Sequence, residues 1–254
     1  MSGAVGIELV GVTKAFGNVR ALSPVDLRVA AGEVVTILGP SGSGKTTLLR
    51  IVGGLDEPTA GVVTIAGASP HEARAAKRIG FVPQSPALLP WRTVGANARL
   101  LLDVNRRRGT KGPDAAELLA EVGLADFVDA YPHELSGGMQ QRVALVRAMA
   151  LGAPVLLMDE PFAALDEITR ADMRHLLARL CERAETTVLF VTHSIAESVF
   201  ISDRVVVLSA RPGRVVGIER IDLPRPRHPA LEDDPAFFAI ETRLRALLHQ
   251  GIGR

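Results

Sequence analysis

Short apolar runs separated by polar segments predict the strands of this chain. Three of them are almost wholly apolar and rich in β-branched residues, as is typical of strands covered on both faces: Val34–Leu38, Val155–Met158 and Thr187–Thr192. Arg204–Leu208 continues the pattern after a polar start. Such strands favour a central parallel sheet, so we expect an α/β protein.

Two earlier segments alternate apolar and polar residues, which predicts strands with one face in solvent. They are Ile7–Thr13 and Ala21–Val29, joined by a turn at Gly17–Asn18. Strands of this kind fit an antiparallel sheet, and Val62–Ile65 and Ile79–Val82 are candidates to extend it. We therefore expect a small antiparallel sheet beside the central one.

Helical spacing dominates three other stretches. It covers residues 84–131, where a basic turn at Arg106–Lys111 is most simply a solvated loop, and residues 167–183. After a stiff linker at Pro224–Pro229, the chain closes with one apolar helix face made of Phe237, Ile240, Leu244, Leu247 and Leu248. The first of these stretches is predicted to be an inserted helical subdomain.

The segment Gly39–Thr46 carries the strongest chemical signal. Its sequence, Gly-Pro-Ser-Gly-Ser-Gly-Lys-Thr, lies between a predicted strand and a predicted helix, where backbone N–H groups can bind a polyphosphate. Lys45 can then reach the β- and γ-phosphates, and the Thr46 hydroxyl can bind Mg²⁺. A glycine-rich turn could match this pattern by chance. However, only four of the 29 Lys and Arg residues are lysines, so the chain generally uses arginine for positive charge. A lysine inside the loop is therefore informative, because a compact ammonium suits phosphate contact better than a forked guanidinium. We therefore predict a nucleotide site.

Charged side chains directly follow two of the predicted buried strands. Asp159 and Glu160 end one strand, and because side chains alternate across a strand, one carboxylate can approach a metal ion and the other a water molecule. His193 follows Thr187–Thr192, at the edge where open parallel sheets bind ligands. Isolated residues of these types are more often surface groups, but beside a nucleotide site they are predicted to be functional.

A second helix N-terminus is predicted within Leu135–Arg142, the sequence Leu-Ser-Gly-Gly-Met-Gln-Gln-Arg. Ser136 is a good N-cap residue, and Gly137 and Gly138 leave the first N–H groups of the helix open to an anion. One nucleotide has little use for two such sites in one chain, whereas two chains that face each other would use both.

The composition limits the partners and the cellular location that this chain is expected to have. The chain has 254 residues, 47% of them hydrophobic, a net charge of +1 and a pI near 8.0, which gives no bulk charge to hold a nucleic acid. Its mean hydropathy of +0.22 comes from short runs, and none approaches the ~20 residues that span a bilayer. No signal peptide is evident at the N-terminus, and the single cysteine, Cys181, favours a reducing cytoplasm.

With these motifs in this order, the chain resembles the ATP-binding subunit of an ABC transporter over nearly its whole length. The resemblance implies a recA-like P-loop NTPase core with an antiparallel β subdomain (residues 1–84 and 155–223), an inserted α-helical subdomain (85–154), and a linker with a C-terminal helix (224–254). It also implies a head-to-tail homodimer that binds ATP and Mg²⁺, transmembrane permease subunits and, indirectly, a separate solute-binding protein. The expected location is peripheral, on the cytoplasmic face of the cell membrane, with no nucleic-acid partner.

The same resemblance implies residue roles at matching positions. Glu160 is expected to be the general base, His193 the switch histidine near the γ-phosphate, and Gln84 the glutamine that senses the nucleotide. Nucleotide contacts are implied for Phe16, Gly39, Ser41, Gly42, Ser43, Gly44, Lys45, Thr46, Thr47, Ser136, Gly137, Gly138, Gln140 and Asp166. Mg²⁺ contacts are implied for Thr46, Gln84 and Asp159. Phe16 stands where an aromatic ring stacks on adenine, although an ordinary half-buried phenylalanine fits equally well.

Two further segments, Leu88–Val94 and Ser209–Val216, resemble the nitrate, sulfonate and taurine import group and related thiamine-precursor importers. Trp91 could equally be a core or an interface aromatic residue. An export or lipoprotein-release ATPase would share every catalytic motif, whereas DNA-repair and translation relatives would add a coiled coil, zinc cysteines or a second cassette. A small GTPase or kinase would lack Leu-Ser-Gly-Gly. We therefore expect the ATP-hydrolysing subunit of an importer.

Overall fold

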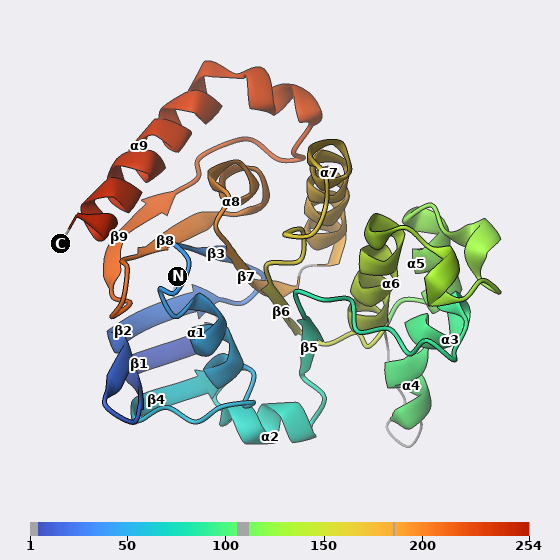
Figure 1. The fold of residues 1–254 in the computed structure, drawn as a ribbon, viewed down its shortest axis with the longest axis horizontal. Helices are drawn as coiled ribbons and strands as arrows, with labels where there is room; N and C mark the ends of the chain where they lie inside the picture. The colour runs from blue at the N-terminus through green and yellow to red at the C-terminus, as the bar shows by residue number, and fades with distance from the viewer. Residues whose placement is uncertain (1–4, 106–111, 185, 254) are drawn as a thin grey trace.

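Two β-sheets organise the chain (Figure 1). A computed structural model describes residues 5–105, 112–184 and 186–253. One sheet has three strands in the order β2-β1-β4, and the other has six in the order β5-β6-β7-β3-β8-β9. The strands are β1 (Val5–Phe16), β2 (Val19–Ala30), β3 (Val34–Leu38), β4 (Ala60–Ile65), β5 (Ile79–Val82), β6 (Val155–Asp159), β7 (Thr187–Thr192), β8 (Arg204–Leu208) and β9 (Val215–Arg220). The predicted α/β class is confirmed.

The smaller sheet is antiparallel, as predicted. Strand β1 pairs with β2 along one edge and with β4 along the other. Alternation is clearest in β2, where Val25, Leu27 and Val29 are buried and the residues between them are exposed. Both predicted strands are longer than their apolar pattern indicated, so that the turn between them is only Gly17 and Asn18.

The prediction that Ile79–Val82 extends the antiparallel sheet is wrong. These residues form β5, which pairs parallel to β6 at the edge of the larger sheet, with Ile79 opposite Val155 and Val82 opposite Met158. Alternation in β5 reflects its edge position, because Gly80 and Val82 are buried and Ile79 and Phe81 are only partly so. An edge strand of a parallel sheet and a half-solvated antiparallel strand therefore leave the same sequence pattern.

Helix α1 lies between the two sheets and shares one apolar core with both. Leu48 and Leu49 belong to the buried cluster that also contains Ile7 from β1 and Leu157 and Leu189 from β6 and β7. The helices are α1 (Lys45–Val52), α2 (Pro70–Ala75), α3 (Val94–Ala98), α4 (Leu100–Val104), α5 (Ala115–Glu121), α6 (Gly137–Met149), α7 (Glu167–Ala184), α8 (Ile195–Ile201) and α9 (Pro235–Ile252). The start of α1, which follows β3, is thereby fixed between two packed layers.

Helices α3 to α6 form a separate group at the right of Figure 1. The segment after β5 is held by the fully buried Asn97, whose amide nitrogen donates to the carbonyl oxygens of Leu89 and Arg92 at 3.1 and 2.9 Å. Trp91 projects from this segment and is 71% exposed, so it is not a core residue. The predicted basic turn at Arg106–Lys111 lies outside the described residues.

The C-terminal helix packs as its apolar pattern predicts. Phe237, Ile240 and Leu244 of α9 are buried against β8, β9 and α8. The linker before it differs from the predicted stiff spacer, because Arg227 is 3% exposed and donates to the carbonyl oxygens of Val199 and Ser202. A buried guanidinium needs such acceptors, so the linker is anchored to the end of α8. None of the described helices combines the length and apolar character needed to cross a bilayer.

Candidate active site

The loop between β3 and α1 is shaped by a close approach to β2. Gly44 has φ +87°, and a Cβ atom there would lie 2.6 Å from Leu22 Cδ2 and 3.1 Å from the Ala21 carbonyl oxygen. Only glycine fits both the conformation and the space. The glycine that the phosphate-binding pattern requires is thus also the residue that seats the loop against the neighbouring sheet.

Lys45 is buried at the first position of α1 and crosses the mouth of the loop. Its Nζ atom donates to the carbonyl oxygens of Gly39 and Pro40 at 2.9 and 3.0 Å, and lies 3.5 Å from Glu160 Oε1. Burial is the main influence on the Lys45 pKa and lowers it. The structure therefore holds a partly desolvated cation beside the N–H groups of a helix N-terminus, an arrangement suited to a polyphosphate.

Asp159 and Thr46 bring two oxygen atoms together across the site. The Thr46 hydroxyl donates to Asp159 Oδ1 at 2.9 Å, and burial raises the pKa of this carboxyl. Hydroxyl and carboxylate oxygens are the donors that Mg²⁺ prefers, so this pair fits the ion. In the described part of the chain no three His, Cys, Asp or Glu side chains group as a metal site, so nucleotide and water oxygens would have to supply much of the coordination shell.

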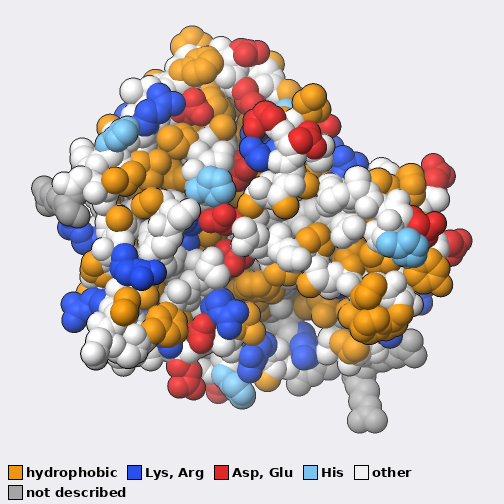
Figure 2. Space-filling view, viewed as in Figure 1, with side chains coloured by type: hydrophobic (Ala, Val, Ile, Leu, Met, Phe, Trp, Pro, Cys, Tyr) orange, Lys and Arg blue, Asp and Glu red, His pale blue; other side chains and the backbone are white. Residues whose placement is uncertain are grey.

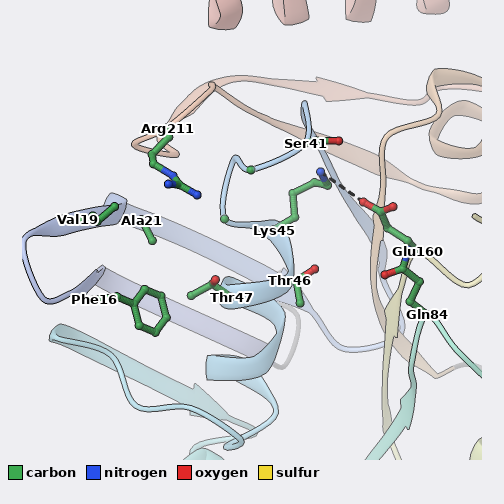
Figure 3. A pocket seen from close by; sticks show the side chains of 12 residues that line it. Phe16, Val19, Ala21, Ser41, Lys45, Thr46, Thr47, Gln84, Glu160 and Arg211 are labelled. Atoms are coloured by element: carbon green, nitrogen blue, oxygen red, sulfur yellow. Dashed lines mark ion pairs between the residues drawn. The ribbon is translucent and has the colours of Figure 1, made fainter. Parts of the chain in front are cut away.

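Glu160 diverges from Asp159, as the strand alternation predicts. Its Oε2 atom lies 3.0 Å from Nδ1 of His193, and its Oε1 faces Lys45 (Figure 3). The backbone of Glu160 has φ +41°, an uncommon conformation for a non-glycine residue, and its N–H donates to the Val191 carbonyl at 2.9 Å. This strained turn aims the carboxylate at the same place as Lys45 and His193.

These elements enclose one open pocket of about 480 Å³, a size typical of ligand sites (Figure 3). Phe16 forms one end, half exposed, with the Lys14 ammonium 4.9 Å from its ring centre. Gln84 and Glu160 line the other end. The full lining is Phe16, Val19, Ala21, Ser41, Gly42, Gly44, Lys45, Thr46, Thr47, Gln84, Glu160 and Arg211. An aromatic ring and a phosphate-binding loop in one pocket match the two ends of a nucleotide.

Seven of the predicted nucleotide-contact residues do not line this pocket: Gly39, Ser43, Ser136, Gly137, Gly138, Gln140 and Asp166. The first two belong to the loop itself, whereas the side chains of Ser136, Gln140 and Asp166 have roles elsewhere in the chain. Ser136 caps α6 by accepting the Met139 N–H at 3.3 Å, next to Gly137 and Gly138. Gln140 donates to the Pro132 and Leu135 carbonyls at 2.9 and 3.3 Å. Asp166 accepts the N–H of Thr169 at 3.0 Å. Within one chain, the N-terminus of α1 therefore lines the pocket and the N-terminus of α6 does not.

Arg211 lines the pocket and was not predicted from the sequence. It lies between β8 and β9, in a turn that Gly213 anchors to β2 by a hydrogen bond from its N–H to the Ala21 carbonyl at 2.9 Å. A Cβ at Gly213 would lie 1.9 Å from the Ser43 carbonyl oxygen, so only glycine allows this approach. The guanidinium thereby extends over the loop toward the pocket (Figure 3). The Arg-Pro-Gly turn was the only local signal.

The fold and pocket define a P-loop nucleotide-binding protein, and known proteins share both. A family model described as ABC transporter matches residues 22–163. An uncharacterised ABC transporter ATP-binding protein of Methanocaldococcus jannaschii is 47% identical over 228 residues, which cover 88% of this chain and 85% of that protein. An aliphatic sulfonates import ATP-binding protein of Xanthomonas axonopodis pv. citri is 44% identical over 224 residues, 87% of this chain and 88% of that protein.

Solved structures of ATP-binding cassettes are similar to this chain as well. The dimeric post-hydrolysis state of an ATP-binding cassette bound to ADP and Pi has a TM-score of 0.73 and 36% identity, covering 86% of this chain and 100% of that one. This chain belongs to the ABC transporter family. It is an ATP-binding subunit with the ATPase domain of that family, and the predicted resemblance is confirmed.

Proposed function

We propose that this chain is the ATP-hydrolysing subunit of an importer, and that Glu160, His193 and Lys45 carry the reaction. The supporting observation is their convergence: one carboxylate lies 3.5 Å from a buried ammonium and 3.0 Å from an imidazole. Lys45 binds the β- and γ-phosphates, Glu160 orients and deprotonates the attacking water, and His193 holds the γ-phosphate. Gln84, at the same end of the pocket, senses the nucleotide.

Magnesium is the second part of the proposal. Thr46, Asp159 and Gln84 are its proposed protein ligands, supported by the 2.9 Å contact between the first two. When bound, the ion neutralises charge on the phosphate oxygens. Phe16 stacks on the adenine ring, which its exposed face at the pocket end allows. The loop residues Gly39, Ser41, Gly42, Ser43, Gly44 and Thr47 surround the phosphates.

A second copy of the chain completes the site in this proposal. The N-terminus of α6, formed by Ser136, Gly137 and Gly138, does not line the pocket of its own chain. The same is true of Gln140 and Asp166. We assign them to the pocket of a partner in a head-to-tail homodimer. The dimeric arrangement of the cassette bound to ADP and Pi supports this assignment.

The helical group supplies a surface for a membrane permease. Hydrophobic side chains gather over it in Figure 2, and the exposed aromatic residues there are Trp91, Phe127 and Tyr131. The chain would bind the cytoplasmic side of the permease and act indirectly on a separate solute-binding protein. Because a sulfonate import subunit is 44% identical, the proposed solutes are small oxyanion-bearing compounds of the sulfonate, taurine and nitrate kind.

Mixed dimers test the shared site. Two differently tagged chains, one carrying Lys45→Ala and the other Ser136→Arg, are purified as a mixed pair through both tags. Each variant alone should be inactive, because both of its sites are damaged. The mixed pair keeps one composite site intact, so ATP hydrolysis should return to a substantial fraction of the wild-type rate. A mixed pair as inactive as its parents would contradict the head-to-tail arrangement.

Partner identification tests the transport role. The tagged chain is purified from membranes of its source organism, and co-purifying proteins are identified by mass spectrometry. We expect a permease with several spans, and ATP hydrolysis by the reconstituted complex should rise when a binding protein delivers a sulfonate, taurine or nitrate. Stimulation by a lipoprotein or an exported compound would instead favour the export alternative.

A further inference from the structure

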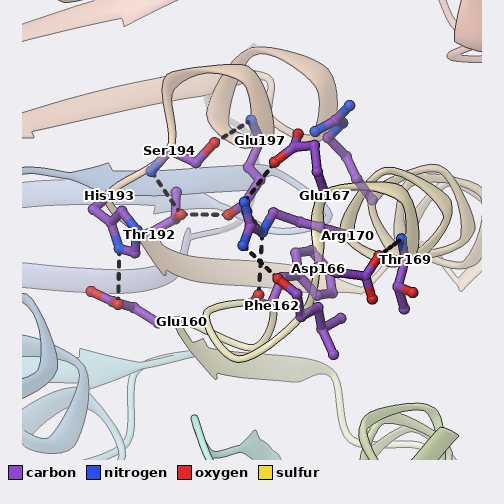
Figure 4. A network of polar contacts seen from close by, with 12 residues as sticks. Glu160, Phe162, Asp166, Glu167, Thr169, Arg170, Thr192, His193, Ser194 and Glu197 are labelled. Carbon is purple, nitrogen blue, oxygen red and sulfur yellow. Dashed lines mark hydrogen bonds and ion pairs between the residues drawn. The ribbon is translucent and has the colours of Figure 1, made fainter. Parts of the chain in front are cut away.

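A buried carboxylate lies behind the strand end that carries His193. Glu197, in the first turn of α8, is 4% exposed and accepts a hydrogen bond from the Thr192 hydroxyl (Figure 4). The same hydroxyl accepts the backbone N–H of Ser194 at 3.0 Å. Thr192 and Ser194 flank His193, so this side-chain contact fixes the backbone on both sides of the imidazole.

Arg170, in α7, faces the same carboxylate from the opposite side. Its Nε atom lies 4.0 Å from Glu197 Oε1 and donates to the Phe162 carbonyl at 3.4 Å, while Nη2 donates to the Leu165 carbonyl at 2.5 Å. Both carbonyls belong to the loop that follows Glu160. A guanidinium suits this position because its donors project in one plane in several directions, which a lysine ammonium cannot reproduce.

Together these contacts close a ring around the proposed site of hydrolysis. Its last link is the 3.0 Å contact between Glu160 and His193. The ring passes through Glu160, His193, Thr192, Glu197, Arg170 and then Leu165 and Phe162, back along the loop to Glu160 (Figure 4). Displacing any member changes the separation of Glu160 and His193, and catalytic groups tolerate shifts of only about 0.5 Å.

We propose that Arg170 and Glu197 are positioning residues for ATP hydrolysis, which set the placement of His193 relative to Glu160. The inference rests on the proposed roles of those two residues in the reaction. A purely structural contact would stabilise the fold without affecting the imidazole. Glu197 is largely shielded from water, so removing Arg170 leaves its charge without the guanidinium and frees the loop and the strand end to move apart.

The test compares four variants. Arg170→Ala and Glu197→Gln should keep ATP affinity within about twofold of wild type and lower kcat about tenfold or more, because only the geometry of hydrolysis changes. The kcat of Arg170→Lys should lie between the kcat of these two variants and that of wild type, because lysine keeps the positive charge but lacks the planar guanidinium with its several donors. The matched control is Glu167→Gln: its side chain is 78% exposed and pairs with Arg170 at 2.8 Å, so its kcat should be unchanged.

Two readouts separate positioning from stability. In NMR spectra of the nucleotide-free chain, the ring resonances of His193 should shift in Arg170→Ala, Arg170→Lys and Glu197→Gln but not in Glu167→Gln. In addition, Arg170→Ala should lower kcat by less than about twofold in a His193→Ala background, because the two act through one group. Arg170→Lys supplies the same comparison if the alanine variant does not fold.

The outcomes are distinguishable. Unchanged His193 resonances with wild-type kcat in the Arg170 and Glu197 variants would overturn the inference, as would full multiplication of the Arg170 and His193 effects. If His193→Ala hydrolyses ATP at the wild-type rate while the ring resonances still shift, the proposed role of His193 fails instead. Altered ATP affinity with unchanged kcat would also overturn the positioning role, because the residues would then act on binding.

Discussion

Glu160→Gln is the substitution that tests the proposed chemistry most directly. Glutamine keeps the size of the side chain and one carbonyl oxygen but removes the charge that lies 3.0 Å from His193 and 3.5 Å from Lys45. A positioned general base contributes about 10²–10⁴-fold to a rate. A rate factor of this size corresponds to about 2.7–5.5 kcal/mol of activation free energy. ATP hydrolysis by the variant should therefore be about 10²–10⁴-fold slower than by the wild type.

ATP affinity should not fall with the rate. Lys45 keeps its contacts with the Gly39 and Pro40 carbonyls, and the loss of a nearby negative charge lowers repulsion of the phosphates. Asp159→Asn should differ, because it removes the carboxylate that contacts Thr46 and so weakens binding of the nucleotide together with magnesium. The two neighbouring carboxylates are therefore separated by which step they impair.

The assay measures binding and chemistry separately. Calorimetry gives the ATP affinity of each variant, and single-turnover phosphate release gives the chemical rate. Light scattering should also detect a closed dimer of Glu160→Gln with ATP and magnesium but not with ADP, since the γ-phosphate joins the two chains in the proposed dimer. Near wild-type turnover would refute the role of Glu160, and lost ATP binding without a closed dimer would mean that the two carboxylates have exchanged roles.

Three further outcomes are expected. Lys45→Ala should weaken ATP binding by about 100-fold, because the buried ammonium nearest the phosphates is removed; calorimetry showing unchanged affinity would exclude the loop from the site. Arg211→Ala should weaken ATP binding about threefold to tenfold, whereas Arg214→Ala, an exposed arginine outside the pocket lining, should not; equal affinities would remove Arg211 from the site. Burial raises the pKa of Cys181 to about 12, so at pH 8 the folded chain should react with a disulfide reagent much more slowly than the same chain unfolded in denaturant, and equal labelling rates would contradict its burial.

Much of the site could be predicted because its motifs are local. The phosphate-binding loop, the Asp159–Glu160 pair and His193 each follow a strand whose apolar, β-branched sequence is distinctive. Once those strands are parallel neighbours, their carboxyl ends meet at one edge of the sheet. Glu160 directly follows β6 and His193 directly follows β7, and these two strands are neighbours in the sheet. Their 3.0 Å contact is thus a consequence of the strand order.

Strand pairing could not be predicted in the same way. The four residues of β5 alternate as a half-solvated strand does, yet they lie beside β6 in the larger sheet. Which sheet receives such a strand depends on residues distant in sequence, here on the placement of Val155–Asp159 next to it. Alternation reports how many faces are covered and contains no information about the neighbouring strand.

Arg170 shows why positioning residues escape sequence patterns while catalytic ones do not. It lies in α7, an amphipathic helix with one buried and one exposed face. An arginine in such a helix is ordinarily a solvated residue of the exposed face. Its significance depends on α7 and α8 packing together, which places Glu197 within 4.0 Å of it and the Phe162 and Leu165 carbonyls within its reach. Catalytic groups are constrained by chemistry to a few residue types at the ends of strands. A residue that holds them is constrained only by where its partners lie in space, so the contact must be seen before the role can be inferred.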